Sequence, residues 1–217
     1  MALFVATLKS NLKLDLKRSL QYLVTPSFFI IIATLFPLAI GSDMEILQLI
    51  GPGILVLSAL LASLLPLSRI YALDYTDGTL DLVHFSHDPF AMYALGKIAA
   101  HWLTTALPLM IVAPFIALSY DLQTPLTTLW LALLPVTMLF TLIGNVTAAL
   151  GTFAKNTSAA LNALLVTPLY IPILIFGSAS LGQPDSTAPL LFLWAGLSIA
   201  LPTAPLLTAG ILKGLRD

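Results

Sequence analysis

The chain has 217 residues, of which 59% are hydrophobic and 9% are charged, and its formal net charge is -1. A soluble domain carries roughly 25% charged residues and could not bury this much apolar surface, so the composition excludes an ordinary soluble protein and indicates an integral membrane protein. The chain also lacks the basic field of a nucleic-acid-binding protein, and without cysteine it can form no disulfide and no thiolate metal site.

The first 22 residues have an amphipathic pattern. Apolar residues recur at every fourth position and lysines recur beside them on another face: Phe4, Leu8, Leu12, Leu16 and Leu20, with Lys9, Lys13 and Lys17. This pattern predicts a helix over residues 1–22 that lies in the membrane interface, and the alternative is a cytoplasmic extension of the first span. The apolar run that follows is too long for the core of a secretory signal, so we expect it to remain as the first membrane helix.

Six apolar blocks follow in chain order, and each is near the roughly 20 residues that a membrane-spanning helix needs. They cover residues 23–41, 46–67, 98–119, 126–150, 159–181 and 189–212. Prolines interrupt most of the blocks, which neighbouring helices can tolerate in lipid, so we expect kinked or broken helices, especially in the last two. The predicted fold class is an all-α integral membrane protein with six transmembrane helices in a single domain, 1–217.

The basic residues fall in alternate loops. All nine lie before the first block, around the second loop, in the fourth loop or at the end of the chain: Lys9, Lys13, Lys17, Arg18, Arg69, Lys97, Lys155, Lys213 and Arg216. The other loops carry only acids, namely Asp43, Glu45, Asp121 and Asp185. The positive-inside rule therefore predicts that both termini face the cytoplasm, or the matrix in an organelle.

The loop over residues 69–97 is the longest polar segment. It contains four acids, the turn signal Asp77-Gly78, and the histidines His84 and His87. The two histidines are three residues apart and could share a metal with Asp81 or Asp88, but no third strong ligand accompanies them. We therefore favour a solvated loop that offers a cytoplasmic partner its contact surface.

His101 and Trp102 follow Lys97 by about one helical turn. One interpretation of His101 is a haem or metal ligand. We favour the other, an interfacial His-Trp pair of the kind found where helices cross the lipid headgroups.

Neither an ATPase nor an ion-driven carrier is indicated by the remaining motifs. Gly96-Lys97 is followed by Ile98 and has no glycine at the distance that a phosphate-binding loop requires, so any ATPase activity would reside in a partner. The apolar blocks contain no deep charged residue, which disfavours a proton or ion relay. Polar residues within them, such as Asn145 and Thr141, most often serve helix packing.

Several short motifs occur in a characteristic order: Phe36-Pro37-Leu38-Ala39-Ile40-Gly41, Gly51-Pro52-Gly53-Ile54, Asp77-Gly78-Thr79-Leu80-Asp81, Gly96-Lys97-Ile98-Ala99-Ala100-His101-Trp102 and Leu107-Pro108-Leu109. With this order and spacing the chain resembles the haem exporter protein B family. The resemblance implies an ABC-2-type exporter-like membrane subunit of an ATP-binding cassette complex for cytochrome c maturation. It also implies the bacterial inner membrane, or the mitochondrial inner membrane for an organelle-encoded chain.

The resemblance further implies the partners. A second copy of the chain and a cassette ATPase (CcmA) would assemble beside the haem-handling protein CcmC and the small protein CcmD. ATP hydrolysis would then release the haem-loaded chaperone CcmE. The chain itself would bind no cofactor, because its partners handle haem and ATP.

The same resemblance places the ATPase contact in the polar loop. The expected interface residues are Asp74, Asp77, Gly78, Thr79, Leu80 and Asp81, with Leu80 as an apolar knob. Two other functions stay open: the membrane subunit of an exporter for a lipid or small hydrophobic molecule, and a passive membrane scaffold.

Overall fold

The computed structural model describes residues 2–17, 19–41, 43–67, 70–85, 89–153, 159–183 and 185–214. Within these ranges the regular structure is helical, which confirms the all-α prediction. The helices are α1 (Ala2–Lys17), α2 (Ser19–Ile40), α3 (Met44–Leu64), α4 (Ala72–Thr76), α5 (Thr79–His84), α6 (Phe90–Ser119), α7 (Leu126–Phe153), α8 (Ala159–Gly182) and α9 (Thr187–Lys213).

Five of the described helices are long and apolar enough to cross a membrane: α2 from Leu23 onward, α3, α6, α7 up to Thr152, and α9. In α8 the segment Thr167–Gly182 is apolar but shorter. The helix ends agree with the predicted blocks to within four residues, except that α6 begins at Phe90 and not at residue 98. Length and composition therefore support a multi-pass membrane protein.

The prolines do not break the last two long helices. In the described residues α8 continues through Pro168 and Pro172, and α9 continues through Pro202 and Pro205. Each proline removes a single backbone donor, whereas a break would expose further backbone groups that lipid cannot satisfy. Of the expected kinked or broken helices, the breaks are absent from these described segments, and the kinks stay a prediction.

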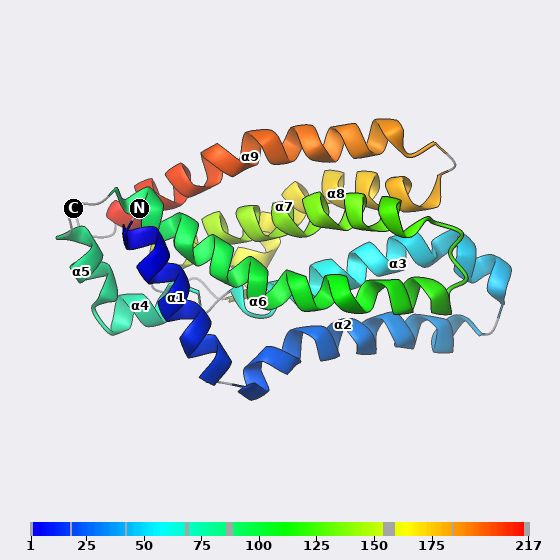
Figure 1. Cartoon of the computed structure of the whole chain (residues 1–217), viewed down its shortest axis with the longest axis horizontal. Helices are drawn as coiled ribbons and strands as arrows, with labels where there is room; N and C mark the ends of the chain where they lie inside the picture. The colour runs from blue at the N-terminus through cyan, green and yellow to red at the C-terminus, as the bar shows by residue number, and fades with distance from the viewer. Residues whose placement is uncertain are drawn as a thin grey trace.

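Helix α7 lies at the centre of the bundle, where it packs against α3, α6, α8 and α9 (Figure 1). The α2–α3, α6–α7 and α8–α9 connections all lie at one end of the bundle. Two hydrogen bonds link the α6–α7 connection to neighbouring helices at this end: Gln48 Nε2 of α3 donates to Asp121 Oδ2 at 2.7 Å, and Thr124 Oγ1 donates to the Leu181 carbonyl of α8 at 2.7 Å. Helices α1, α4 and α5 and the last turns of α9 lie at the other end, which we call the α4–α5 end (Figure 1).

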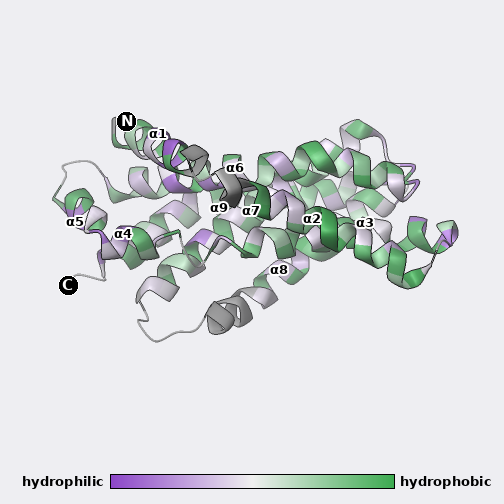
Figure 2. Cartoon of the chain, turned by 90° about the horizontal axis from the view of Figure 1, so that it is seen from below, coloured by the Kyte–Doolittle hydropathy of each residue, from purple (hydrophilic) through white to green (hydrophobic). Residues whose placement is uncertain are grey.

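The outward surface of the long helices is apolar. Figure 2 shows hydrophobic residues along the helices of the bundle and hydrophilic residues mainly towards its two ends. Large apolar side chains on this surface are strongly exposed, among them Leu38, Leu49, Leu118, Leu191 and Ile199. In water such a surface would cause aggregation, but in a bilayer it contacts lipid.

Helix α1 is fixed to α6 by a close crossing at Gly96. A Cβ atom on Gly96 would lie 2.8 Å from the Thr7 Cβ atom and 3.0 Å from the Phe4 carbonyl oxygen, so only glycine allows this approach. The opposite side of α1 leaves Lys9 and Lys13 exposed, as an interfacial helix requires. The position of α1 in the membrane interface stays a prediction.

Adding one methyl group at the crossing should push α1 away from α6. We expect Gly96→Ala to lower the unfolding free energy of the detergent-solubilised protein by about 1–3 kcal/mol, the usual effect of overpacking. Gly53→Ala is the matched control, because the same addition in the middle of α3 meets no atom within 4 Å. Thermal unfolding of the two variants checks this expectation, and equal melting temperatures would contradict it.

Candidate functional site

The segment expected as a polar loop over residues 69–97 is mostly helical. It forms α4, a tight turn, α5 and the first two turns of α6. The turn is the predicted one: Gly78 has φ +79°, and the Asp77 carboxylate accepts a hydrogen bond from the Thr79 backbone N–H at 2.9 Å. Hydrogen bonds from the side chain and backbone of Thr79 hold the pKa of Asp77 below its usual value. Asp77 therefore carries a negative charge at the surface of the turn.

Helix α5 carries two stripes of apolar side chains, which lie on opposite sides of the helix. Leu80 and Val83 are 2% and 6% exposed, and both pack in an apolar cluster at the α4–α5 end. Leu82 and Phe85 are 75% and 79% exposed. Leu80 thus cannot serve as the apolar knob that we expected, because its side chain faces the cluster. Leu82 and Phe85 offer the exposed apolar surface.

The other expected interface residues differ in exposure. Asp77 is exposed, whereas Gly78, Thr79 and Asp81 are half-buried in the turn and the first turn of α5. The backbone N–H of Asp81 donates to the Gly78 carbonyl at 3.0 Å, which starts the helix. These residues form the turn between α4 and α5 and the first turn of α5.

Asp74 lies in a buried ion pair. Its Oδ2 atom is 2.5 Å from Lys97 Nζ, and the Tyr93 hydroxyl donates to the same oxygen. Lys97 Nζ also donates to the Ile70 carbonyl at 3.2 Å. The side chains of Lys97 and Asp74 are only 8% and 14% exposed. Lys97, which we had placed at the edge of a loop, is therefore an interior residue of α6.

A second buried polar contact joins this region to α7. The Tyr71 hydroxyl, in the segment just before α4, donates to Asn145 Oδ1 at 3.0 Å, and Asn145 Nδ2 donates to the Thr141 carbonyl at 2.8 Å. Tyr71 and Asn145 are fully buried. Burial, and then the negative charge of Asp74, raises the pKa of Tyr71 well above its usual range, so the phenol stays a hydrogen-bond donor.

The histidines do not assemble a metal site in the described part of the chain. His84 is exposed, and its ring meets Phe85 edge-on with centroids 5.8 Å apart. His87 and Asp88 lie outside the described residues. Among the residues that the structure describes, no group of three or more His, Cys, Asp or Glu side chains gathers as a metal site.

His101 and Trp102 both pack within the helical bundle. His101 is 7% exposed, while the Trp102 indole N–H donates to the Thr137 hydroxyl of α7 at 3.2 Å. Because α6 begins at Phe90, both residues lie three turns inside the helix, and their position at the level of the lipid headgroups stays a prediction. Both side chains take part in helix packing.

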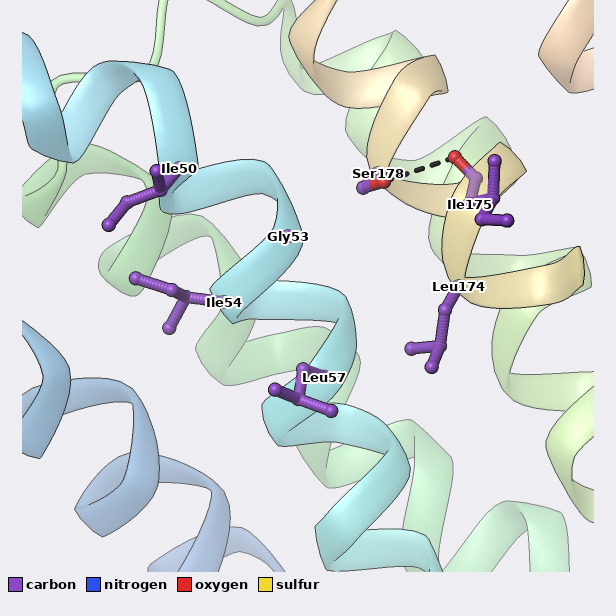
Figure 3. Close-up of a pocket in the computed structure, with 7 residues that line it drawn as sticks. All are labelled: Ile50, Gly53, Ile54, Leu57, Leu174, Ile175 and Ser178. Atoms are coloured by element: carbon purple, nitrogen blue, oxygen red, sulfur yellow. Dashed lines mark hydrogen bonds between the residues drawn. The ribbon is translucent and has the colours of Figure 1, made fainter. Parts of the chain in front are cut away.

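An apolar groove of about 380 Å³ opens between α3 and α8 (Figure 3). Its lining residues are Ile50, Gly53, Ile54, Leu57, Leu174, Ile175 and Ser178. The Ser178 hydroxyl already donates to the Ile175 carbonyl at 3.0 Å, so this lining offers no free hydrogen-bond donor and no basic group. The groove suits aliphatic chains and not a ligand with carboxylates or a metal ion.

Comparison with known proteins identifies the family of the chain. The model of the family described as "CcmB protein" matches residues 2–211. Proteins named "Heme exporter protein B" are similar over most of their length. The protein of Rhodobacter capsulatus is 42% identical over 175 residues, which cover 80% of this chain and 79% of the relative. The protein of Pseudomonas aeruginosa is 40% identical over 191 residues, which cover 86% and 85%.

A third relative extends the match. The "Heme exporter protein B" of Bradyrhizobium diazoefficiens is 36% identical over 214 residues, which cover 96% of each chain. The family match and these identities extend over both the helical bundle and the α4–α5 segment. The chain belongs to the CcmB protein family.

Proposed function

We propose that this chain is the membrane subunit of an ATP-binding cassette transporter complex for cytochrome c maturation. It couples ATP hydrolysis by a partner ATPase to the export of haem or the release of a haem-loaded chaperone. The family membership supports the complex, and the exposed stripe of Leu82 and Phe85 at the α4–α5 end is the observation that supports the coupling role.

The ATPase contact is made by the outward side of the α4–α5 pair. Leu82 and Phe85 supply two large apolar side chains, and Asp77 supplies a charge beside them. An exposed apolar patch with a polar rim is the usual form of a docking surface. The buried stripe of α5 fixes the helix to the bundle, so that force on the outward stripe reaches the membrane helices.

The partners follow from the same proposal. The cassette ATPase CcmA binds the α4–α5 pair, a second copy of this chain completes the membrane part, and CcmC, CcmD and CcmE handle the haem. In this assembly ATP and haem are handled by the partners, and the chain supplies no catalytic group. This is the arrangement expected of an ABC-2-type membrane subunit.

The proposed topology has six spans, with α8 as the fifth in chain order. It places the α4–α5 end in the cytoplasm and the chain in the bacterial inner membrane. Lys9, Lys13 and Lys213 lie at this end, whereas Asp43, Glu45, Asp121 and Asp185 lie at the other, which satisfies the positive-inside rule.

Cysteine labelling tests this topology directly, because the natural chain has no cysteine. We expect Asp185→Cys to react with a membrane-impermeant maleimide in intact spheroplasts, and Thr76→Cys to react only after permeabilisation. Both positions are exposed. Protection of Asp185→Cys in intact spheroplasts would contradict a membrane-spanning α8.

A second candidate is the membrane subunit of an exporter for a lipid or another small hydrophobic molecule. The groove between α3 and α8 favours it, because an aliphatic chain fits that lining. A passive scaffold would bind haem-handling proteins without needing ATP.

Deletion in the host separates these candidates. We expect loss of this chain to remove haem-stained c-type cytochromes while b-type cytochromes persist, and a plasmid copy to restore them. A lipid exporter would leave the c-type cytochromes unchanged. If an ATPase-dead partner supports normal cytochrome maturation, the chain is a scaffold.

A further inference from the structure

Two buried polar contacts join the α4–α5 pair to two different long helices. Asp74 of α4 pairs with Lys97 and accepts from Tyr93, both of α6, while Tyr71 donates to Asn145 of α7. The Tyr71 and Tyr93 rings lie 6.4 Å apart between these contacts. The two contacts are therefore neighbours in one buried network.

This network is set within an apolar cluster that would already hold the short helices. The cluster contains Tyr71, Leu80, Val83, Phe90, Tyr93, Ala148, Ala149, Ala209 and Leu212. Removing a lysine and a carboxylate from water is costly, and apolar residues in place of a buried ion pair are often equally stable. Stability alone does not account for these polar groups.

A polar network adds a defined geometry to an apolar cluster. Apolar contacts allow neighbouring helices to slide, whereas hydrogen bonds weaken steeply when their geometry changes. The Lys97 ammonium group is held by the Asp74 carboxylate at 2.5 Å and the Ile70 carbonyl at 3.2 Å. Lys97 of α6 is thus held by the carboxylate of Asp74 in α4 and by a backbone carbonyl just before α4. These two contacts fix the position of α4 relative to α6.

We propose that the Asp74–Lys97 and Tyr71–Asn145 contacts are positioning contacts that make the α4–α5 pair move as one unit with the adjacent ends of α6 and α7. This inference rests on the proposed function, because the ATPase supplies the displacement. Helix α7 packs against α3, α8 and α9, so movement delivered at Asn145 reaches the rest of the bundle. The network transmits the movement of the ATPase to the membrane helices without contacting the ATPase.

The test neutralises the ion pair without leaving a buried charge. In Asp74→Asn/Lys97→Met the asparagine keeps an oxygen that can accept from Tyr93, and methionine keeps most of the volume of lysine. Tyr71→Phe/Asn145→Leu removes the second contact in the same way. The control is Gln48→Met/Asp121→Asn, which removes a polar contact between elements at the opposite end of the bundle.

Both network variants are expected to retain the ATPase and hydrolyse ATP as the unchanged complex does. Cytochrome c maturation per ATP hydrolysed should fall at least about tenfold, which corresponds to a coupling free energy of about 1.4 kcal/mol. The control should mature cytochromes normally. The reversed pair Asp74→Lys/Lys97→Asp should restore maturation relative to Asp74→Asn/Lys97→Met.

Three results would overturn the inference. The first is normal cytochrome maturation in both network variants. The second is loss of ATPase binding together with loss of maturation. The third is a reversed pair that assembles in normal amounts but matures no more cytochrome than Asp74→Asn/Lys97→Met. The failure of the proposed function looks different, because the unchanged chain would then bind no ATPase or support no cytochrome maturation.

Discussion

Replacing Leu82 and Phe85 together by serine is expected to abolish stable binding of the partner ATPase. The two side chains are 75% and 79% exposed in the isolated chain, and a docked ATPase would bury both. Burial of one large apolar side chain contributes about 1.5–3 kcal/mol, so their joint loss should weaken binding by at least about 2 kcal/mol, or roughly 30-fold. The amount of ATPase that co-purifies per copy of the tagged chain measures the effect.

The matched control is Phe115→Ser/Leu118→Ser near the other end of α6. This pair has the same residue types at the same spacing, and its side chains are 67% and 73% exposed. We expect it to leave ATPase binding unchanged. Equal ATPase recovery from the α5 variant and the control would contradict the docking surface.

Replacing Lys97 alone by methionine should strongly destabilise the protein. The Asp74 carboxylate would lose its cationic partner at 2.5 Å while it stays largely buried. Removing one partner of a buried ion pair costs about 3–5 kcal/mol, because the remaining charge is left uncompensated. Thermal unfolding in detergent measures this loss.

The double variant Asp74→Asn/Lys97→Met should recover most of that stability, because no buried charge remains. If the single variant melts at the same temperature as the unchanged protein, Asp74 and Lys97 do not form a buried pair. If the double variant is as unstable as the single one, lost packing of the lysine side chain explains the effect.

The helices could be predicted from the sequence because hydropathy marks them locally. Each long block contains enough consecutive apolar residues to identify a helix, whatever the rest of the chain does. The charge of Lys97 indicates a loop residue, so the sequence predicts that the helix begins at residue 98 and not at Phe90. The burial of Lys97 depends on Asp74, which lies 23 positions earlier and contacts it only after folding.

The contact surface that we propose lies in the segment that the sequence indicates, but on the side of α5 opposite to Leu80. Leu80 and Val83 are three residues apart, and so are Leu82 and Phe85, so the sequence carries two apolar stripes of equal spacing. Periodicity cannot tell which stripe packs against the bundle. The packing of α5 against the apolar cluster decides it, and that contact involves α6, α7 and α9.

Tyr71 and Asn145 show a further limit of local patterns. Asn145 was expected to serve helix packing, and the structure places it there, but its partner is 74 positions away and outside the apolar blocks. Buried polar residues within membrane helices usually find such partners. A buried asparagine in the sequence therefore predicts that its side chain has a hydrogen-bond partner, but it does not identify that partner.

The most direct test of the proposed function is a pull-down of the tagged chain from solubilised membranes, followed by mass spectrometry of the proteins that co-purify. The proposal predicts a cassette ATPase together with haem-handling proteins, and it predicts that the ATPase is lost when Leu82 and Phe85 are replaced by serine. Recovery of an ATPase without haem-handling proteins would favour the lipid exporter, and recovery of no ATPase would contradict the coupling role.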